Sequence, residues 1–250
     1  MLYLAGNFLI SMEQLIDFFI DPYRHTPAIY IILEFTAAFL GILSVWYAKK
    51  ENILVYPVGI ISTSIYVYLL SRWQLYGDLI INIYYTLMSI YGWYMWLKPV
   101  DKTHKERIIT RANMRDWLIT TAIFIVTAVF VLAVYRHYKV IPEFNGWTSF
   151  REYFLMHFKP DVKELQKITP FLDTFTTAAA MAAMWLMAMK KLENWHLWIA
   201  LNIVSIPLYF IKGYGFTGIQ YFIFLILAVQ GLHEWKKRWK TESGKSLQTL

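Results

Sequence analysis

Cysteine is absent from this chain of 250 residues, and charged residues make up only 16% of it. Without Cys, the chain can have no disulfide framework, no thiolate metal site and no thiol-based redox chemistry. The phosphate-cradling sequence G-x-x-x-x-G-K-[ST] and the nucleophile turn G-x-S-x-G are missing as well. These absences argue against an ATP-driven pump and against an enzyme, and they give no reason to expect a cofactor.

Histidine supplies no metal motif either. The six histidines contain no i, i+4 pair. Ligation of a haem by two of them is disfavoured, because they fall near the expected membrane surfaces or at a helix start, where a polar ring is readily satisfied. The sequence therefore predicts no metal site.

Apolar residues dominate what is present. The chain is 58% hydrophobic and 18% aromatic, with a mean hydropathy of +0.40, which is typical of an integral membrane protein embedded in a lipid bilayer. The net charge of +7 comes from short basic clusters beside apolar runs. Such clusters set orientation in a membrane, so we expect no nucleic-acid partner.

Seven segments are long enough, at about 20 residues each, to cross the hydrocarbon layer. The predicted spans are Ala28–Ala48, Ile53–Leu70, Leu79–Leu97, Trp117–Tyr135, Phe171–Met189, Trp195–Ile211 and Thr217–Trp235. The expected fold class is therefore an all-α integral membrane protein with seven transmembrane helices.

The chain also repeats itself. Thr26-Pro27 leads through an apolar run to Lys49-Lys50-Glu51-Asn52, and Thr169-Pro170 leads through another to Lys190-Lys191-Leu192-Glu193-Asn194. Each half then ends on G-x-x-x-W, with Gly92 following Asn52 and Gly231 following Asn194 at nearly the same spacing. Two parallel three-helix repeats need a single helix between them to return the chain to its starting side. The pattern predicts a 3+1+3 transporter with its substrate between the halves.

The predicted organisation follows from these spans. It comprises an N-terminal interfacial segment (1–27), the first repeat (28–97), a basic cytoplasmic loop (98–116), a linker helix (117–137), an external loop with an amphipathic helix (138–167), the second repeat (168–236) and a cytoplasmic tail (237–250). The amphipathic helix is expected from Trp147, Phe150, Phe154 and Phe158. One side of the membrane receives 15 of the 24 Lys and Arg residues and the other receives nine, so we expect the N-terminus outside and the C-terminus in the cytoplasm.

Polar and aromatic residues share helical faces in several spans. Candidate substrate-binding residues are Asn82, Tyr85 and Thr86 in the third span, Trp195, Trp198 and Asn202 in the sixth, and Gln220 in the seventh; Tyr56, Gly59, Thr63 and Tyr66 share a face of the second. Each of these could merely bridge helices, which contributes about 0.6 to 2 kcal/mol per bond. Together, amides and large aromatics favour a pocket for a flat polar ligand.

Two acids, Glu34 and Asp173, lie in or near apolar spans. Ionised carboxylates there need a partner or a function. Thr169 and Pro170 are expected at the N-cap and first helical position, which would place Asp173 where the helix dipole stabilises it. Glu34 lies too far from Pro27 for that explanation. We therefore keep Asp173 as a candidate substrate-binding residue and expect that either Asp173 or Glu34 attracts a cationic ligand. The structural alternatives are stabilisation of Asp173 by the helix dipole and pairing of Glu34 within the bundle.

Several motifs resemble the PnuC family of nicotinamide riboside transporters. They are Glu193-Asn194-Trp195-His196-Leu197-Trp198 followed by Asn202, the two G-x-x-x-W endings, Leu75-Tyr76-Gly77-Asp78 and Tyr91-Gly92-Trp93-Tyr94-Met95-Trp96. The resemblance implies a fold related to the SWEET sugar transporters and residence in a bacterial inner membrane. It also implies facilitated diffusion of nicotinamide riboside, which a cytoplasmic riboside kinase traps. Self-assembly is left open.

Other functions remain in view. Related Pnu proteins carry thiamine or riboflavin, so another vitamin is an alternative substrate. A heptahelical receptor, or a membrane enzyme acting on an aromatic lipid such as a quinone, is the alternative from a different class. Measurement of solute flux separates the classes, because only a transporter moves its ligand across a sealed membrane.

Overall fold

Helices account for almost all of the computed structural model, which describes residues 12–74, 76–98 and 107–248. A short helix α1 (Met12–Ile20) and a 3-10 turn η1 (Asp21–Tyr23) come first. The long helices are α2 (Ala28–Lys49), α3 (Val55–Arg72), α4 (Tyr76–Leu97), α5 (Met114–His137), α8 (Thr169–Ala188), α9 (Asn194–Ile211) and α10 (Gly215–Gln248); between α5 and α8 lie α6 (Trp147–His157) and α7 (Val162–Gln166). A helix therefore covers each of the seven predicted spans.

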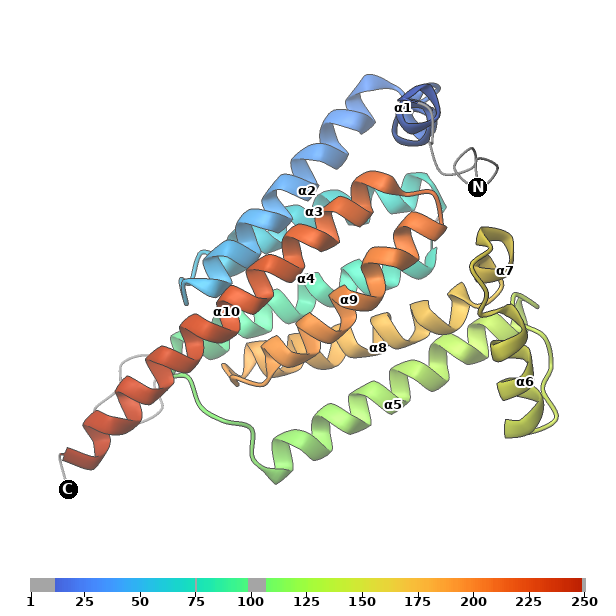
Figure 1. Ribbon diagram of the computed structural model, residues 1–250. Coiled ribbons are helices and arrows are strands. Elements are labelled where there is room, and N and C mark those ends of the chain that lie inside the picture. Colours follow the sequence, from blue (N-terminus) through green and yellow to red (C-terminus); the bar gives the residue numbers. More distant parts are fainter. Residues whose placement is uncertain (1–11, 75, 99–106, 249–250) are drawn as a thin grey trace, which may run out of the picture.

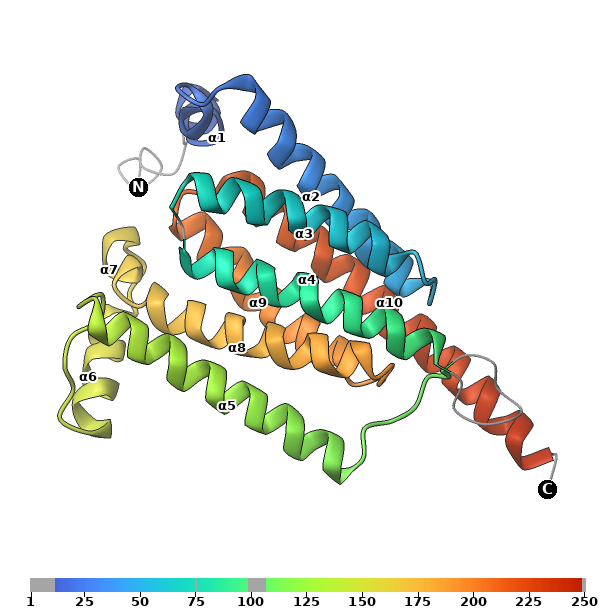
Figure 2. The ribbon, with the colours of Figure 1, turned by 180° about the vertical axis from the view of Figure 1, so that it is seen from behind.

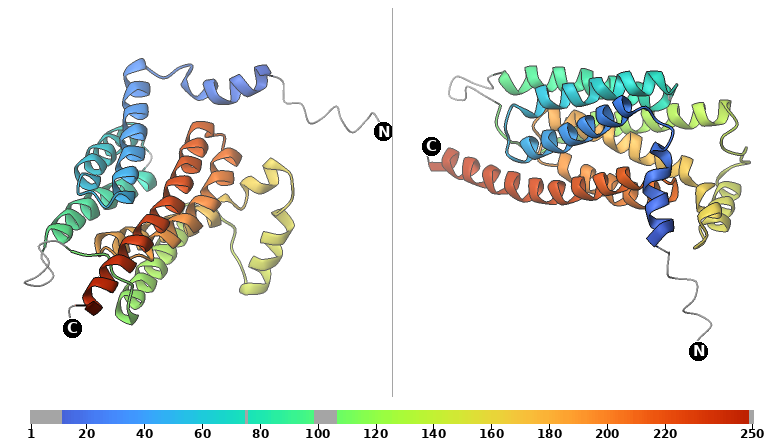
Figure 3. Two further views of the ribbon diagram at one scale, coloured as in Figure 1. Left: turned by 60° about the vertical axis from the view of Figure 1, so that its left-hand side comes forward. Right: turned by 90° about the horizontal axis from the view of Figure 1, so that it is seen from above.

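Six of the long helices form a closed ring. Contacts run from α2 to α3, α4, α8, α9 and α10, and then from α10 back to α2. Helix α5 stands outside the ring and packs on α8, on the side away from α2 (Figure 2). Figure 3 shows α2–α4 and α8–α10 as two groups of helices. The centre of the ring therefore lies between these two groups, which we call the two halves.

The two halves are related by one constant separation in the sequence, which we call the repeat offset. It is the step from Val55 at the start of α3 to Asn194 at the start of α9, and it also links the ends of these helices and the starts of α4 and α10. The turn that ends α2 recurs at the end of α8: the N–H of Asn52 donates to the Tyr47 carbonyl and the N–H of Lys191 to the Leu186 carbonyl, both at 2.9 Å. The residues before them, Glu51 and Lys190, take the left-handed conformation, with φ of 58° and 55°.

This offset corrects one feature of the predicted repeat. The sequence pattern pairs Asn52 with Asn194, but the structural equivalent of Asn52 is Lys191. The error explains why the two spacings to the G-x-x-x-W glycines are unequal. The glycines themselves, Gly92 and Gly231, obey the repeat offset.

The ring has two distinct ends. We call the end where α2 and α8 finish the basic end, because Lys49, Lys50, Lys190 and Lys191 lie there, and the other the α6 end. Helices α2 and α8 both run from the α6 end to the basic end, and α5 returns the chain (Figure 1). The last turns of α10 project beyond the other helices at the basic end (Figures 1 and 3). Of the predicted basic loop 98–116, residues 99–106 lie outside the described part, as do residues 1–11 of the N-terminal segment.

Length and composition suit a membrane. Five of the described helices are long and apolar enough to cross one: α2, α5, α8, α9 and residues Gly215–Thr241 of α10. Helix α6 forms where the amphipathic pattern predicted it, from Trp147. Its Phe150 packs edge-on against Phe171 at the start of α8, with 5.2 Å between ring centroids, whereas Trp147 and Phe158 are exposed. Helix α6 is therefore attached to the ring through a few aromatic contacts.

Candidate substrate site

Three aromatic side chains from different helices of the ring pack on one small core, which Phe124 of α5 also contacts. Tyr85 of α4, Trp198 of α9 and Tyr221 of α10 pack together with a core of Ala179, Ala180 and Leu201. All three aromatics remain half-buried. The small alanines of α8 allow this convergence, because they leave room for large rings against the helix backbone. The structure therefore brings together two predicted site residues, Tyr85 and Trp198, and adds Tyr221.

A polar face of α9 continues from this cluster towards the α6 end. Trp198, Asn202, Ser205 and Tyr209 follow one another at helical spacing. Asn202 and Ser205 are buried, and the Ser205 hydroxyl has no partner within the described part of the chain. Tyr209 stacks on Tyr221, with 4.9 Å between ring centroids and 15° between planes. The face is therefore lined by aromatic planes and by polar groups that can bond a solute.

The equivalent face in the first half belongs to α3. Gly59, Thr63 and Tyr66 are related to Trp198, Asn202 and Ser205, in that order, by the repeat offset. The two faces that the sequence singled out in spans two and six are thus the same structural feature. Their side chains have diverged, because one half offers a large indole and an amide where the other offers a glycine and a hydroxyl. A ligand between them meets two chemically different walls.

The remaining predicted residues make hydrogen bonds within the bundle, to a neighbouring helix or to their own helix. Thr86 Oγ1 lies 2.7 Å from Thr63 Oγ1 and donates to the Asn82 carbonyl. The Asn82 amide donates to the carbonyl of Asp78 in its own helix, at 2.9 Å. Gln220 Nε2 donates to the Ala38 carbonyl of α2 at 3.5 Å, and Tyr66 lies beside Gln220. Thr86 and Gln220 therefore also bridge helices, which is the role that the sequence could not separate from binding.

Trp195 lies apart from the other candidates. It is fully buried at the basic end, where its ring fills the space that a Cβ on Gly231 would occupy, 2.6 Å away. Its ring meets Trp235 edge-on, at 5.5 Å between centroids. Trp195 shares a helical face with Trp198 and Asn202, but it packs in the core that closes one end of the ring.

The two acids of the apolar helices α2 and α8 occupy equivalent positions, since the repeat offset relates Glu34 to Asp173. Asp173 is paired with Lys212, whose Nζ lies 2.7 and 2.5 Å from the two carboxylate oxygens. Glu34 accepts a hydrogen bond from the Tyr23 hydroxyl at 3.1 Å. Burial, and then the nearby Glu34 carboxylate, raise the pKa of Tyr23 above its ordinary value. The first acid therefore has a neutral partner and the second a cationic one.

The ion pair changes the sequence-based explanation of Asp173. Ile168, and not Thr169, is the N-cap of α8, and Thr169 Oγ1 donates to the Gln166 carbonyl at 2.8 Å. The predicted N-cap at Thr169 is therefore wrong. Asp78, at the start of α4, is exposed and lies close to both Asp173 and Lys212. The α6 end of the site thus carries two carboxylates and one ammonium.

Sequence reasoning missed Tyr209, Tyr221 and Lys212. Tyr221 directly follows the candidate Gln220, so it lies beside the predicted residue on a neighbouring face of the helix. Lys212 directly follows α9 and is far from Asp173 along the chain, so nothing in the spacing linked them. The repeat offset was the available signal, because it makes Tyr221 the equivalent of Asn82.

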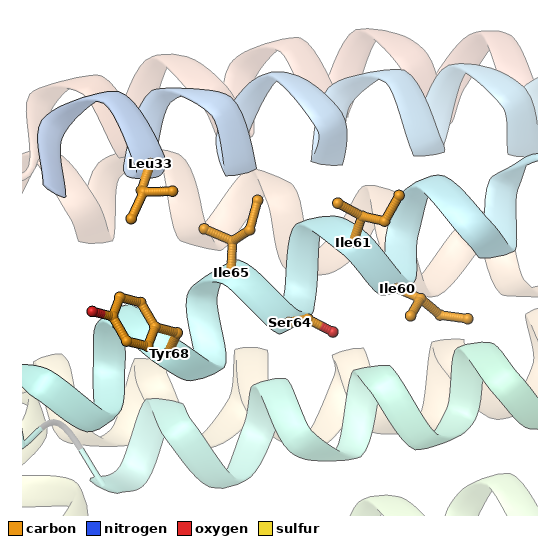
Figure 4. A pocket seen from close by; sticks show the side chains of 6 residues that line it. All are labelled: Leu33, Ile60, Ile61, Ser64, Ile65 and Tyr68. Carbon is orange, nitrogen blue, oxygen red and sulfur yellow. The ribbon is translucent and has the colours of Figure 1, made fainter. Parts of the chain in front are cut away.

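A hollow between α2 and α3 is a different feature from this site. It is lined by Leu33, Ile60, Ile61, Ser64, Ile65 and Tyr68 (Figure 4). Ile61 and Tyr68 are each about half exposed, and five of the six side chains offer little but hydrocarbon or an aromatic ring. This hollow suits a lipid chain rather than a polar solute.

The candidate site has the groups to hold a planar polar molecule. Aromatic rings supply stacking surfaces, and Asn202, Thr63 and Ser205 supply hydrogen-bonding groups. In the described residues, no three His, Asp or Glu side chains lie close enough together to hold a metal ion. A planar solute with hydrogen-bonding groups at its edges matches the chemistry of these side chains.

Comparison with known proteins identifies a family of transporters. The sequence profile of the nicotinamide mononucleotide transporter family matches residues 31–237. The chain is 24% identical to the nicotinamide riboside transporter PnuC of Escherichia coli K12 over 81% of this chain and 84% of the relative. It is 28% identical to the protein of that name from Neisseria mucosa, over 85% and 75%. A riboflavin/roseoflavin transporter, RibM of Streptomyces davaonensis, is 26% identical over 62% of both chains.

A solved structure shares the fold. The crystal structure of the vitamin B3 transporter PnuC superposes on 84% of this chain and 82% of that one, with a TM-score of 0.57 and 26% identity. The family match spans both halves of the ring and α5. The chain belongs to the PnuC family of membrane transporters.

Proposed function

We propose that this protein carries nicotinamide riboside across a bacterial cytoplasmic membrane, through the centre of the six-helix ring. The observation that carries the proposal is the convergence of Tyr85, Trp198 and Tyr221 between two equivalent halves. In this proposal all seven long helices span the bilayer as a 3+1+3 arrangement, with residues 28–97 and 168–236 as the repeats and 117–137 as the linker. The N-terminus lies outside, and the basic end faces the cytoplasm.

The ligand's chemistry suits the site. Nicotinamide riboside has a cationic pyridinium, a carboxamide and ribose hydroxyls. Trp and Tyr faces attract a cation by about 0.5 to 2 kcal/mol, and the Asn202 amide and the Thr63 hydroxyl can bond the neutral polar groups. We assign the site to Trp198, Asn202, Tyr85 and Tyr221, with Asn82, Thr86 and Gln220 as supporting contacts.

Charge favours the riboside over its phosphorylated form. Asp78 and Asp173 lie at the α6 end of the site, and the cation beside them, Lys212, is already paired with Asp173. A nucleotide phosphate would be repelled by these carboxylates and would have to compete with Asp173 for Lys212, whereas a pyridinium is attracted by them. The relatives named for the riboside support the same choice.

We propose that transport is passive and that phosphorylation by a cytoplasmic kinase makes uptake one-way. The absence of a nucleotide-binding loop in the sequence supports this proposal. Purified protein in sealed vesicles without a kinase should equilibrate radiolabelled riboside and should not concentrate it. Accumulation above the external concentration under a proton or sodium gradient would overturn the passive mechanism.

Riboflavin is the second candidate substrate, because a riboflavin/roseoflavin transporter is among the relatives. The test is calorimetric binding of the purified protein to nicotinamide riboside, its mononucleotide, riboflavin and thiamine. We expect the riboside to bind and the other three to bind at least tenfold more weakly. Tighter binding of riboflavin than of the riboside would make riboflavin the proposed substrate and would leave the proposed transport function unchanged.

The site assignment has its own test. We expect Asn202→Ala to weaken riboside binding by about 1 to 3 kcal/mol, the scale of a lost buried hydrogen bond. Ile203→Ala is the matched control, because Ile203 is the next residue of the same helix and faces outward, 55% exposed. Equal affinity of the two folded variants for the riboside would show that Asn202 is not part of the site. Trp195→Ala tests the remaining candidate in the same assay.

A further inference from the structure

The G-x-x-x-W tryptophans cross from one half of the ring to the other. The Trp96 indole N–H of α4 donates to the Met187 carbonyl of α8, at 3.0 Å. The Trp235 indole N–H of α10 donates to the Ala48 carbonyl of α2, at 2.9 Å. The repeat offset relates both the donors and the acceptors, so the two bonds are one contact made twice. Each half therefore holds the end of the other half's first helix.

An aromatic cluster surrounds these bonds at the basic end. Tyr56 and Trp96 meet edge-on at 5.1 Å, Trp195 and Trp235 do so at 5.5 Å, and Trp96 and Trp235 lie 5.9 Å apart, all between ring centroids. Tyr56 presses on Gly92 as Trp195 presses on Gly231, at distances that leave no space for a Cβ. These four rings are each at most 2% exposed. They fill the space between the halves.

A buried ion pair lies beside the rings. Lys190 Nζ is 2.7 Å from the Glu51 carboxylate, with side chains 4% and 12% exposed, and Arg238 approaches the same carboxylate at 3.1 Å. The Lys190 ammonium also donates to the Arg107 carbonyl at 2.5 Å and lies over the Trp96 ring, 4.6 Å from its centroid. Glu51 and Lys190 hold equivalent positions in the two halves, so this pair too joins half to half.

We propose that Trp96, Trp235, Glu51 and Lys190 form a gate that closes the basic end of the ring. A solute at Trp198 can leave towards the basic end only between the halves, where these side chains meet. Both charges and both indole N–H groups lie at the end of the bundle. When a contact separates, water can therefore take the place of the lost hydrogen-bonding partner. The aromatic faces exclude water only while the gate is closed.

The test measures the accessibility of a reporter beyond the gate. It needs no substrate, so its outcome does not depend on the proposed function. Because the chain has no Cys, a maleimide labels only the introduced Cys of a Ser205→Cys variant. Ser205 is buried on the Trp198 face, about 15 Å along α9 from Trp195. A membrane-impermeant maleimide is added to sealed vesicles oriented so that an Asn52→Cys variant is labelled, which places the reagent at the basic end.

We expect Glu51→Gln and Lys190→Gln each to raise the labelling rate of Ser205→Cys from the basic end by about tenfold, the factor that corresponds to a lost charge-assisted bond. Asp116→Asn is the matched control. It breaks the pair of Asp116 with Lys191, which is 2.9 Å long and comparably buried, but that pair joins α5 to the second half and does not cross the ring. Its labelling rate should stay at the parent value.

Conservative changes at the tryptophans give a second measurement. Trp96→Phe and Trp235→Phe keep an aromatic ring and lose the indole N–H, and we expect a similar rise in labelling for both. Trp185→Phe is the control, because the Trp185 indole N–H has no partner among the described residues. Unchanged labelling in the folded Glu51 and Trp235 variants, or an equal rise with Asp116→Asn, would show that these contacts are a fixed part of the core and overturn the gate.

Discussion

The first helices of the two halves, α2 and α8, occupy equivalent places in the ring but differ in how deeply their side chains are buried. Phe39 of α2 is 64% exposed, whereas its equivalent in α8, Ala178, is fully buried. The difference follows from the neighbours. Among the long helices, α8 packs extensively on α4, α5 and α9, whereas α2 packs extensively on α3 and α10. Helix α5, the long helix outside the ring, therefore adds to the burial of the Ala-rich stretch of α8, which also packs against aromatic rings of α4, α9 and α10.

This comparison separates what the repeat determines from what its surroundings determine. Turns and interhelical bonds between the halves at the basic end are shared, as at Glu51 and Lys190 or at Trp96 and Trp235. Outer surfaces differ, because one faces α5 and the other faces the space that lipid would fill. Variants at equivalent positions should accordingly have equal effects inside the ring and unequal effects outside it.

The largest expected effect is at the shared tryptophans. Trp96→Ala and Trp235→Ala should each lower the free energy of unfolding by about 3 to 5 kcal/mol, because each removes a fully buried ring and an interhelical hydrogen bond. Thermal unfolding in detergent measures the loss. Costs that differ severalfold between the two variants would show that the halves do not share their core equally.

A smaller effect should separate the outer surfaces. Ala178→Leu should destabilise the protein by about 1 to 3 kcal/mol, since α8 has no room for a larger side chain. Phe39→Leu, at the equivalent position of α2, should change stability by less than about 0.5 kcal/mol. If the two substitutions cost the same in that unfolding assay, then burial by α5 is not what makes α8 rich in alanine.

The paired acids should differ in their effect on a charged ligand. Asp173→Asn should lower affinity for the cationic riboside by about 1 kcal/mol relative to its uncharged reduced form, and Lys212→Met should change the same difference in the opposite direction. The same affinity difference is measured in Glu34→Gln, because Glu34 has the neutral Tyr23 as its partner, and is compared with the differences in the Asp173 and Lys212 variants. Calorimetry with the two ligands measures the differences. Equal losses for both ligands in Asp173→Asn would make this acid structural.

The smallest effect concerns the segment that precedes α8. Hydrogen bonds from Lys167 and His157 lower the pKa of Glu164 to about 2, from an ordinary value of 4.5. Because the folded pKa is the lower one, the ionised carboxylate stabilises the contact between α6 and α7 above about pH 4.5, and this contribution is lost as the pH falls towards 2. Protection of the α7 amides, measured as hydrogen exchange relative to the intrinsic rate at each pH, should therefore fall over this range, and Glu164→Gln should remove this fall in protection. An unchanged profile in that variant would assign the effect to other groups.

Much of the fold could be predicted because hydrophobic length and a repeated motif are local properties of the sequence. The site was harder. Periodicity placed Trp195, Trp198 and Asn202 on one face of a helix, but it could not say that Trp195 lies deep at one end against Gly231. The pairing of Asp173 with Lys212, and the reach of Trp235 to Ala48, depend on which helices meet. The spacing of residues along one helix does not indicate which other helices pack against it.

The opposite charges at Glu51 and Lys190 have a consequence for how such a chain can be assembled. Related by the repeat offset, these residues meet between the halves, so a dimer made of two copies of the first half would set one carboxylate against another. Two copies of the second half would set ammonium against ammonium, and like charges buried together repel. The tryptophan bonds, whose acceptors are backbone carbonyls, would survive either duplication. In a single polypeptide that contains one copy of each half, the carboxylate of the first half faces the ammonium of the second half.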